Sequence, residues 1–210
     1  MSIHEFLTVM NEEDALVPQR IHDVLPQIEK AVEKIVEALN QGGRLFYVGS
    51  GTSGRLGILD AVECPPTFST TNEVNGIIAG GPSAFVKAKE GAEDHEDDGQ
   101  REIMEAGICD KDVVVGIAAS GRTPHTIGAL KQANKIGAYT ISIACNPDSE
   151  IGKVAKLAID MNLGPEVITG STRLKAGTAQ KLVLNMLSTA SMVGIGKTYQ
   201  NLMVDLKPSN

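Results

Sequence analysis

The sequence has 210 residues, a net charge of −7 and 42% hydrophobic residues, which suits one α/β domain with a helical extension. It has no tryptophan, 3% aromatic residues and no cationic stripe, which argues against a nucleic-acid partner. No apolar run reaches the roughly 18 residues of a membrane helix, and no signal-peptide pattern opens the chain, so we expect a cytoplasmic protein without a membrane partner. The three cysteines and four histidines show no metal-ligand spacing, which predicts reduced thiols and no metal.

The first 40 residues predict helices. Residues 1 to about 17 are mixed and predict a short helix, whereas apolar residues recur at helical spacing over residues 18–40. Pro26 either starts the main helix or kinks it, and Gly42 and Gly43 end it. A doubly wound sheet needs no long helix before its first strand. We therefore expect residues 1–40 to form an extension that packs across the partner subunit of a homodimer.

Strands and helices alternate over the rest of the chain. Apolar runs predict strands at about 44–49, 75–80, 112–118, 139–144 and 157–161. Helical patterns follow at about 54–63, 83–91, 96–106, 124–137, 149–154 and 173–196. This alternation predicts a three-layer α/β/α sandwich with a five-stranded, mostly parallel sheet.

A glycine- and hydroxyl-rich loop at 49–54 joins the first strand to a helix. Glycines let a backbone approach an anion closely, and the first N–H groups of a helix attract negative charge. The spacing of Gly49, Gly51 and Gly54 also fits a dinucleotide fingerprint, but no acidic residue ends the next strand to hold a ribose. The loop therefore favours a sugar phosphate or similar monoester over a dinucleotide or a purely structural turn. The candidate phosphate ligands here are Ser50, Gly51, Thr52 and Ser53.

Two further hydroxyl-rich loops precede helices, at 119–124 and 169–175. In the first, Thr123 is a good N-cap and Pro124 suits the first helical turn. Because ligands of doubly wound sheets bind at the carboxyl ends of strands, the three loops together predict one anion-accepting pocket. The further candidates are Ser120, Gly121, Arg122, Thr123, Ser171, Thr172 and Lys175. Arg122, Arg173 or Lys175 could neutralise the charge of the anion.

These loops resemble the sugar isomerase (SIS) domain, and several longer motifs narrow the resemblance. The motifs are GTSGRLG at 51–57, ECPPT at 63–67, EGAED at 90–94, KAGTAQKLVLN at 175–185 and NLMVD at 201–205. Together they resemble the N-acetylmuramic acid 6-phosphate etherase family over about residues 10–206. The resemblance implies a SIS-type sheet in flavodoxin-like strand order and a phosphosugar-binding domain over residues 41–210. It also implies that the family's C-terminal helical domain is absent.

The resemblance implies a reaction as well. The family cleaves the D-lactyl ether of N-acetylmuramic acid 6-phosphate to N-acetylglucosamine 6-phosphate and D-lactate, by elimination and then hydration, without a cofactor, in cell-wall recycling. By motif, Glu63 becomes the proton donor and Glu93 the second catalytic glutamate, the general base. An alkoxide leaving group needs a donor and a carbon acid needs a base, so two carboxylates fit this chemistry. Partial burial beside Pro65 and Pro66 would favour the protonated form of Glu63.

Two other functions remain open. A non-catalytic sugar-phosphate sensor would use the same phosphate loops but would not need Glu63 and Glu93. An aldose–ketose isomerase would need a base at C2 but no acid directed at C3. Assays for D-lactate, for ketose formation and for binding without turnover distinguish the three.

Overall fold

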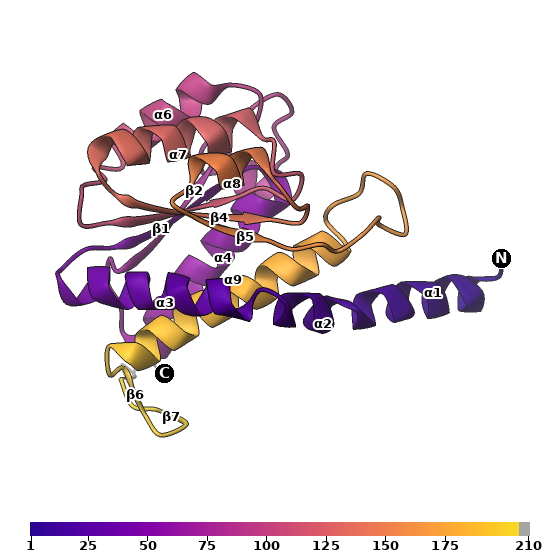
Figure 1. Ribbon diagram of the computed structural model, residues 1–210, viewed down its shortest axis with the longest axis horizontal. Coiled ribbons are helices and arrows are strands. Elements are labelled where there is room, and N and C mark those ends of the chain that lie inside the picture. The colour runs from indigo at the N-terminus through magenta and orange to yellow at the C-terminus, as the bar shows by residue number, and fades with distance from the viewer. Residues whose placement is uncertain (206–210) are drawn as a thin grey trace.

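The computed structural model describes residues 1–205, and its N-terminal part consists of three helices (Figure 1). These are α1 (Ile3–Ala15), α2 (Val17–His22) and α3 (Leu25–Asn40). The side chain of Ser2 accepts a hydrogen bond from the N–H of Glu5 in a capping box, which fixes the start of α1. Pro26 lies in the first turn of α3, so it starts this helix and does not kink it. No residue of α1 is buried, and α1 projects away from the sheet.

Five parallel strands form the central sheet, in the order β2-β1-β3-β4-β5. Their bounds are β1 (Leu45–Gly49), β2 (Val74–Ile78), β3 (Val113–Ile117), β4 (Tyr139–Ala144) and β5 (Leu157–Asp160). Strands β1 and β3 are buried along their whole length, as expected where helices cover both faces of a sheet. The expected strands, their parallel pairing and the flavodoxin-like order are confirmed.

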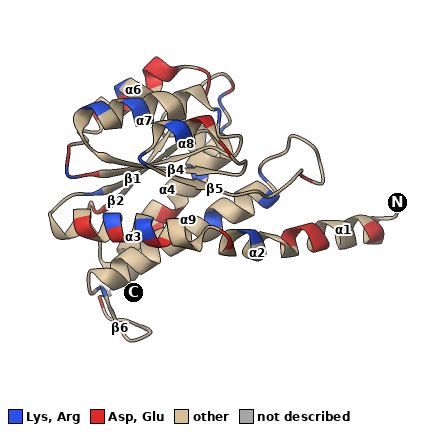
Figure 2. Ribbon diagram, in the orientation of Figure 1, with Lys and Arg blue, Asp and Glu red and all other residues tan. Residues whose placement is uncertain are grey.

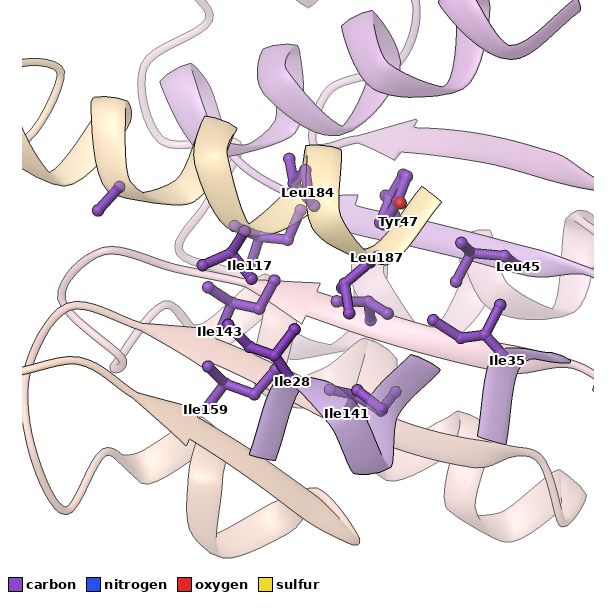
Figure 3. Packing of buried hydrophobic residues seen from close by; sticks show 14 of the residues in the cluster. Ile28, Ile35, Leu45, Tyr47, Ile117, Ile141, Ile143, Ile159, Leu184 and Leu187 are labelled. Carbon is purple, nitrogen blue, oxygen red and sulfur yellow. The ribbon is translucent and has the colours of Figure 1, made fainter. Parts of the chain in front are cut away.

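Helices cover both faces of the sheet and complete a three-layer sandwich (Figure 1). They are α4 (Gly51–Phe68), α5 (Ser83–Val86), α6 (Glu96–Glu105), α7 (Pro124–Ile136), α8 (Glu150–Val154) and α9 (Lys175–Gly194). The larger core lies under α3, α4 and α9, where Ile28 and Leu187 pack beside sheet residues such as Ile141 (Figure 3). A second core joins the opposite face to α6, α7 and α8. Acidic and basic residues recur along α3 (Figure 2), and Glu29, Lys30, Glu33, Lys34 and Glu37 are exposed.

Three local features differ from the expectations. Helix α4 continues through Pro65 and Pro66 to Phe68, although neither proline has an N–H to donate to the carbonyl oxygen four residues earlier. Helix α5 ends at Val86, short of the expected boundary near 91. An unexpected hairpin of β6 (Thr198–Tyr199) and β7 (Leu202–Met203) follows α9. Two-residue strands carry too little periodicity to be read from a sequence.

Helices α6 and α7 cross closely at two glycines. A Cβ atom added to Gly99 would lie 2.0 Å from the carbonyl oxygen of His125, and one on Gly128 would lie 2.0 Å from that of Glu96. Because backbone atoms cannot yield as a flexible side chain can, Gly99→Ala should lower the free energy of unfolding by about 1–3 kcal/mol. Urea denaturation measures the loss. Gly177→Ala is the matched control within α9, since its Cβ would meet nothing closer than 3.5 Å. An equal loss in both variants would contradict the close crossing.

Candidate functional site

A cavity of about 280 Å³ lies at the carboxyl ends of β1, β2 and β3. It includes the point between β1 and β3 where the strand order reverses, the usual ligand site of such sheets. The starts of α4 and α7 and the segment 79–93 enclose it. Its polar lining residues are Ser50, Thr52, Ser53, Arg55, Lys89, Glu90, Glu93, Ser120, Thr123 and Thr172.

Glycines allow the 49–54 loop to reach this position. Gly51 has a φ of +55°, a backbone conformation that residues with a Cβ rarely adopt. At Gly54, a Cβ would lie 2.5 Å from the carbonyl oxygen of Gly49. The start of α4 therefore packs directly on the end of β1, and its N-terminal N–H groups lie at the edge of the cavity.

Two of the helix starts at this edge are left without a cap. Ser50 and Thr123 occupy the N-cap positions of α4 and α7, yet no side chain from residues 1–205 caps either helix. Within the same residues, the buried Ser50 Oγ has no hydrogen-bond partner. By contrast, Ser149 Oγ accepts from the N–H of Gly152 at 2.9 Å and caps α8. The uncapped starts of α4 and α7 both border the cavity, and their unpaired N–H groups make an environment that suits an anion.

The start of α9 is already occupied. The carboxylate of Glu166 accepts hydrogen bonds from the N–H groups of Lys175, at 3.0 Å, and Ala176, at 2.9 Å. A phosphate at this helix start would compete with that carboxylate. Of the third loop, Thr172 lines the cavity but Ser171 does not.

Three other expected ligands also lie outside the cavity. Lys175 is buried, and its Nζ pairs with Glu13 Oε2 at 2.5 Å, so it joins α9 to α1. Arg122 lines a separate shallow cavity beside residues 146–150. Gly121 packs against Ser149, because a Cβ added to Gly121 would lie 2.4 Å from the Cβ of Ser149.

Two cations outside the predicted set of ligands, Arg55 and Lys89, line the cavity. Arg55 donates from Nε to the carbonyl oxygen of Phe85, at 2.9 Å, and from Nη2 to that of Ala84, at 2.8 Å. It thereby fastens the α5 segment beside the first turns of α4. Lys89 Nζ donates to the carbonyl oxygen of Gly80 at 2.5 Å. The position of Arg55 directly after the last glycine of the loop could have indicated that it lies near the cavity. Lys89 lies in an irregular segment, where no sequence pattern indicates its position.

Glu93 borders the same cavity and is half-buried. Its carbonyl oxygen accepts from the backbone N–H of His125, in the first turn of α7, at 3.0 Å. The buried ring of His125 bonds through Nε2 to Glu102 Oε2 on α6, at 2.8 Å. Glu93 is therefore held next to the anion-binding environment by the packing of α6 on α7.

Glu63 lies in a different cavity. It is exposed near the end of α4, about 18 Å along the helix from Gly51 at 1.5 Å per residue. The cavity that it lines measures about 580 Å³ and is enclosed by α4, α9 and the β6–β7 hairpin. The expected partial burial of Glu63 is therefore not found in the single chain. Glu63 and Glu93 do not share a cavity within this chain.

The Glu63 cavity contains further polar groups. Asp60 is buried, and its Oδ1 accepts from Ser188 Oγ at 3.1 Å. Burial raises the pKa of Asp60, although the hydrogen bond from Ser188 and the nearby Lys181 charge oppose the rise. Lys181 Nζ donates to Asn185 Oδ1 on the next turn of α9. The cavity therefore combines carboxyl groups, amides, hydroxyls and one ammonium group.

The described residues, 1–205, contain neither a cluster of metal ligands nor a membrane span. In that range no three His, Cys, Asp or Glu side chains are arranged to hold a metal ion. No helix in the same range combines the length and apolar character needed to span a bilayer. Cys64, Cys109 and Cys145 are free, and burial raises the pKa of Cys64 and of Cys145 to about 12.

Sequence comparisons identify the family. The profile of the glucokinase regulatory protein N-terminal SIS domain matches residues 27–134, and that of the SIS domain matches residues 89–190. The chain is 60% identical over its whole length to proteins from Oenococcus oeni and Halalkalibacterium halodurans, and spans 71% of each. Both are named N-acetylmuramic acid 6-phosphate etherase. A relative of the same name from Bacillus cereus is 58% identical over the whole chain, which spans 72% of it. This chain belongs to the N-acetylmuramic acid 6-phosphate etherase family.

Solved structures confirm the SIS-type fold of this etherase-family chain. A phosphoheptose isomerase from Neisseria gonorrhoeae superposes with a TM-score of 0.70 at 17% identity, over 90% of this chain and 98% of that one. A phosphoheptose isomerase from Francisella tularensis gives a TM-score of 0.70 at 15% identity, over 92% and 100%. At such low identity the likeness concerns the fold alone.

Proposed function

We propose that this chain cleaves the D-lactyl ether of N-acetylmuramic acid 6-phosphate, giving N-acetylglucosamine 6-phosphate and D-lactate. The observation that carries the proposal is the 60% identity, over the whole chain, to relatives named for this etherase activity. The cavity between the uncapped starts of α4 and α7 supports it, because it suits a phosphate monoester beside a carboxylate. Such an activity would serve the recycling of cell-wall amino sugars in the cytoplasm. Residues 41–210 would form the phosphosugar-binding domain, and residues 1–40 its helical extension.

The phosphate of the open-chain sugar would bind the N–H groups and hydroxyls at the two helix starts. The aldehyde at C1 acidifies the proton on C2, which Glu93 removes as general base. Electrons from the C2–H bond form a C2–C3 double bond, and the C3–O bond breaks. Glu63 protonates the departing ether oxygen, which releases D-lactate. Addition of water, with hydroxide to C3 and a proton to C2, completes N-acetylglucosamine 6-phosphate. A positioned acid and a positioned base each contribute about 10²–10⁴-fold.

The two glutamates would act on one sugar across a homodimer. Within a subunit they line separate cavities, so a single chain brings only one of them to a bound substrate. A partner subunit that places its Glu63 over the cavity beside Glu93, at the carboxyl ends of the strands, would supply the second glutamate. Exposed apolar residues on the projecting α1, Ile3 at 81% and Leu7 at 57%, support an association that covers them. In a two-fold dimer, both composite sites would be equivalent.

Incubation with N-acetylmuramic acid 6-phosphate tests the activity. We expect D-lactate and N-acetylglucosamine 6-phosphate in equal amounts, the former measured with D-lactate dehydrogenase. A folded sample that binds N-acetylglucosamine 6-phosphate in calorimetry but releases no lactate would act as a sensor. Conversion of a hexose 6-phosphate to its ketose would indicate an isomerase instead.

Loss of one hydroxyl tests the phosphate site. Ser50→Ala removes the buried, unpartnered Oγ at the start of α4, so N-acetylglucosamine 6-phosphate should bind about 10- to 100-fold more weakly, the range for a hydrogen bond to a charged group. Isothermal titration calorimetry measures the dissociation constant. Ser83→Ala, at an exposed position outside the cavity lining, is the control and should bind normally. Unchanged binding by Ser50→Ala would remove this hydroxyl from the site.

A further inference from the structure

Lys181 is the one Lys or Arg, among residues 1–205, that lines the Glu63 cavity. It extends from α9 and donates from Nζ to Asn185 Oδ1, which fixes the ammonium group against the helix. An ammonium carries three donors, so two remain after this bond. The carboxyl groups of the cavity belong to Asp60, which is buried, and Glu63, which is exposed. Among the side chains that line this cavity, Lys181 therefore offers the positive charge that would attract an anion.

The group that leaves in the proposed reaction is itself an anion. The D-lactyl ether has a carboxylate and a methyl group on the carbon next to the ether oxygen. A proton donor that reaches this oxygen must therefore lie within a few ångströms of the carboxylate. If Glu63 is that donor, the lactyl group enters the Glu63 cavity, and its negative charge needs a partner there.

The lining of the cavity has polar residues that suit the carboxylate of the lactyl group and apolar residues that suit its methyl group. Its polar residues include Lys181, Asn185, Ser188 and Thr189 on α9. Its apolar residues, which could cover the methyl group, are Leu59, Phe68, Val193, Leu202 and Met203. The volume of about 580 Å³ exceeds what a lactyl group needs, which leaves room for the sugar ring or a partner segment.

We propose that Lys181 binds the carboxylate of the lactyl group and is a specificity-determining residue of the etherase reaction. The inference rests on the proposed function, and it names a subsite that the sugar phosphate itself does not use. Lys181 lets the site discriminate in affinity between the substrate and the sugar product, because N-acetylglucosamine 6-phosphate has no lactyl group to contact it. It also places the ether oxygen beside Glu63, since the carboxylate and that oxygen are attached to the same carbon.

A pair of substrates and a pair of variants test the subsite. The substrates are N-acetylmuramic acid 6-phosphate and its lactamide, in which a neutral carboxamide of nearly the same shape replaces the carboxylate. Lys181→Met should lower kcat/KM for the acid by about 10- to 100-fold, the range for a charge-assisted hydrogen bond, and change that for the amide by less than about twofold. Lys181→Arg should restore part of the loss. Lys153→Met, which removes an exposed lysine paired with Glu150, is the control and should match wild type.

Binding measurements test the lactyl subsite separately from the proposed reaction, because they need no turnover. With Glu93→Gln as the background, so that the substrate stays intact, Lys181→Met should weaken binding of the acid and leave binding of N-acetylglucosamine 6-phosphate unchanged. An equal loss for acid and amide would overturn the inference, because Lys181 would then act through Asp60, Glu63 or the fold. A third outcome is that wild type releases no lactate, binds the acid more tightly than the amide, and loses this preference in Lys181→Met. In that case the proposed function fails and the subsite stands.

Discussion

A mixture of two inactive variants, Glu63→Gln and Glu93→Gln, should recover about one quarter of wild-type etherase activity, as expected for equivalent sites shared across a two-fold dimer. Each variant alone should lose about 10²–10⁴-fold, because it lacks either the proton donor or the base at both sites. In a mixed dimer, one site combines the intact Glu93 of one subunit with the intact Glu63 of the other. The second site lacks both. Random exchange makes half of the dimers mixed, and half of their sites are intact.

The recovery depends on the separate cavities of the two glutamates. Lactate release is measured after subunit exchange, with mass spectrometry confirming the mixed dimers. Glu93→Gln mixed with the double variant is the control, because no combination of those chains contains both groups at one site. If verified mixed dimers stay inactive, the two glutamates do not act across subunits. A monomeric mass for the active protein would have the same consequence.

Asp112→Ala should lower the free energy of unfolding by about 3–5 kcal/mol, the usual cost of removing one partner of a buried ion pair. Asp112 is 1% exposed and precedes β3, at the opposite end of the sheet from the cavity at the carboxyl ends of the strands. Its Oδ2 accepts from Arg44 Nη2 at 2.8 Å and from the N–H of Cys109 at 2.9 Å. Its Oδ1 accepts from the N–H of Arg44 at 2.8 Å. Removal of the carboxylate leaves these donors without an acceptor and weakens the connection between β1 and β3.

Chemical denaturation measures the loss, and Glu150→Ala is the control. Glu150 pairs with Lys153 at 2.7 Å on the surface, with side chains 53% and 61% exposed, so its removal should cost at most about 1 kcal/mol. Because Asp112 lies away from the cavity, the folded variant should bind N-acetylglucosamine 6-phosphate with wild-type affinity. Loss of binding in a folded sample would contradict a purely structural role.

The contribution of Asp112 should also depend on pH. Burial raises the pKa of this carboxyl, but hydrogen bonds from Arg44 and the N–H of Cys109 outweigh burial and hold the pKa below its ordinary value. A carboxyl whose pKa is lower in the folded state stabilises the protein above its unfolded pKa of about 3.9. The stabilisation is lost as the pH falls through the lower, folded value. The difference between wild type and Asp112→Asn should therefore be constant near neutral pH and shrink below about pH 4. A difference that grows in acid would contradict this sign.

Much of the fold followed from local patterns in the sequence. Apolar runs gave the five strands to within two residues, because a strand buried on both faces must be apolar along its length. The glycines of the 49–54 loop predicted the tight turn beside the cavity at the carboxyl ends of the strands, since a left-handed turn and close contact between backbones are requirements of single residues. The start of α7 followed in the same way from Pro124.

Tertiary contacts decided which candidates share a site. Lys175 looks like a phosphate ligand in sequence, but Glu13, 162 positions earlier, binds its Nζ. The start of α9 looks free until Glu166 folds back onto its N–H groups. Glu63 and Glu93 are both present in the sequence, yet only the length and direction of α4 put them in separate cavities. The sequence by itself therefore determined the strands, the turns and the residue types of the chemistry, since these depend on backbone geometry and periodicity. Only the tertiary structure decided which charges are neutralised and which face a cavity, because both depend on partners far away in the chain.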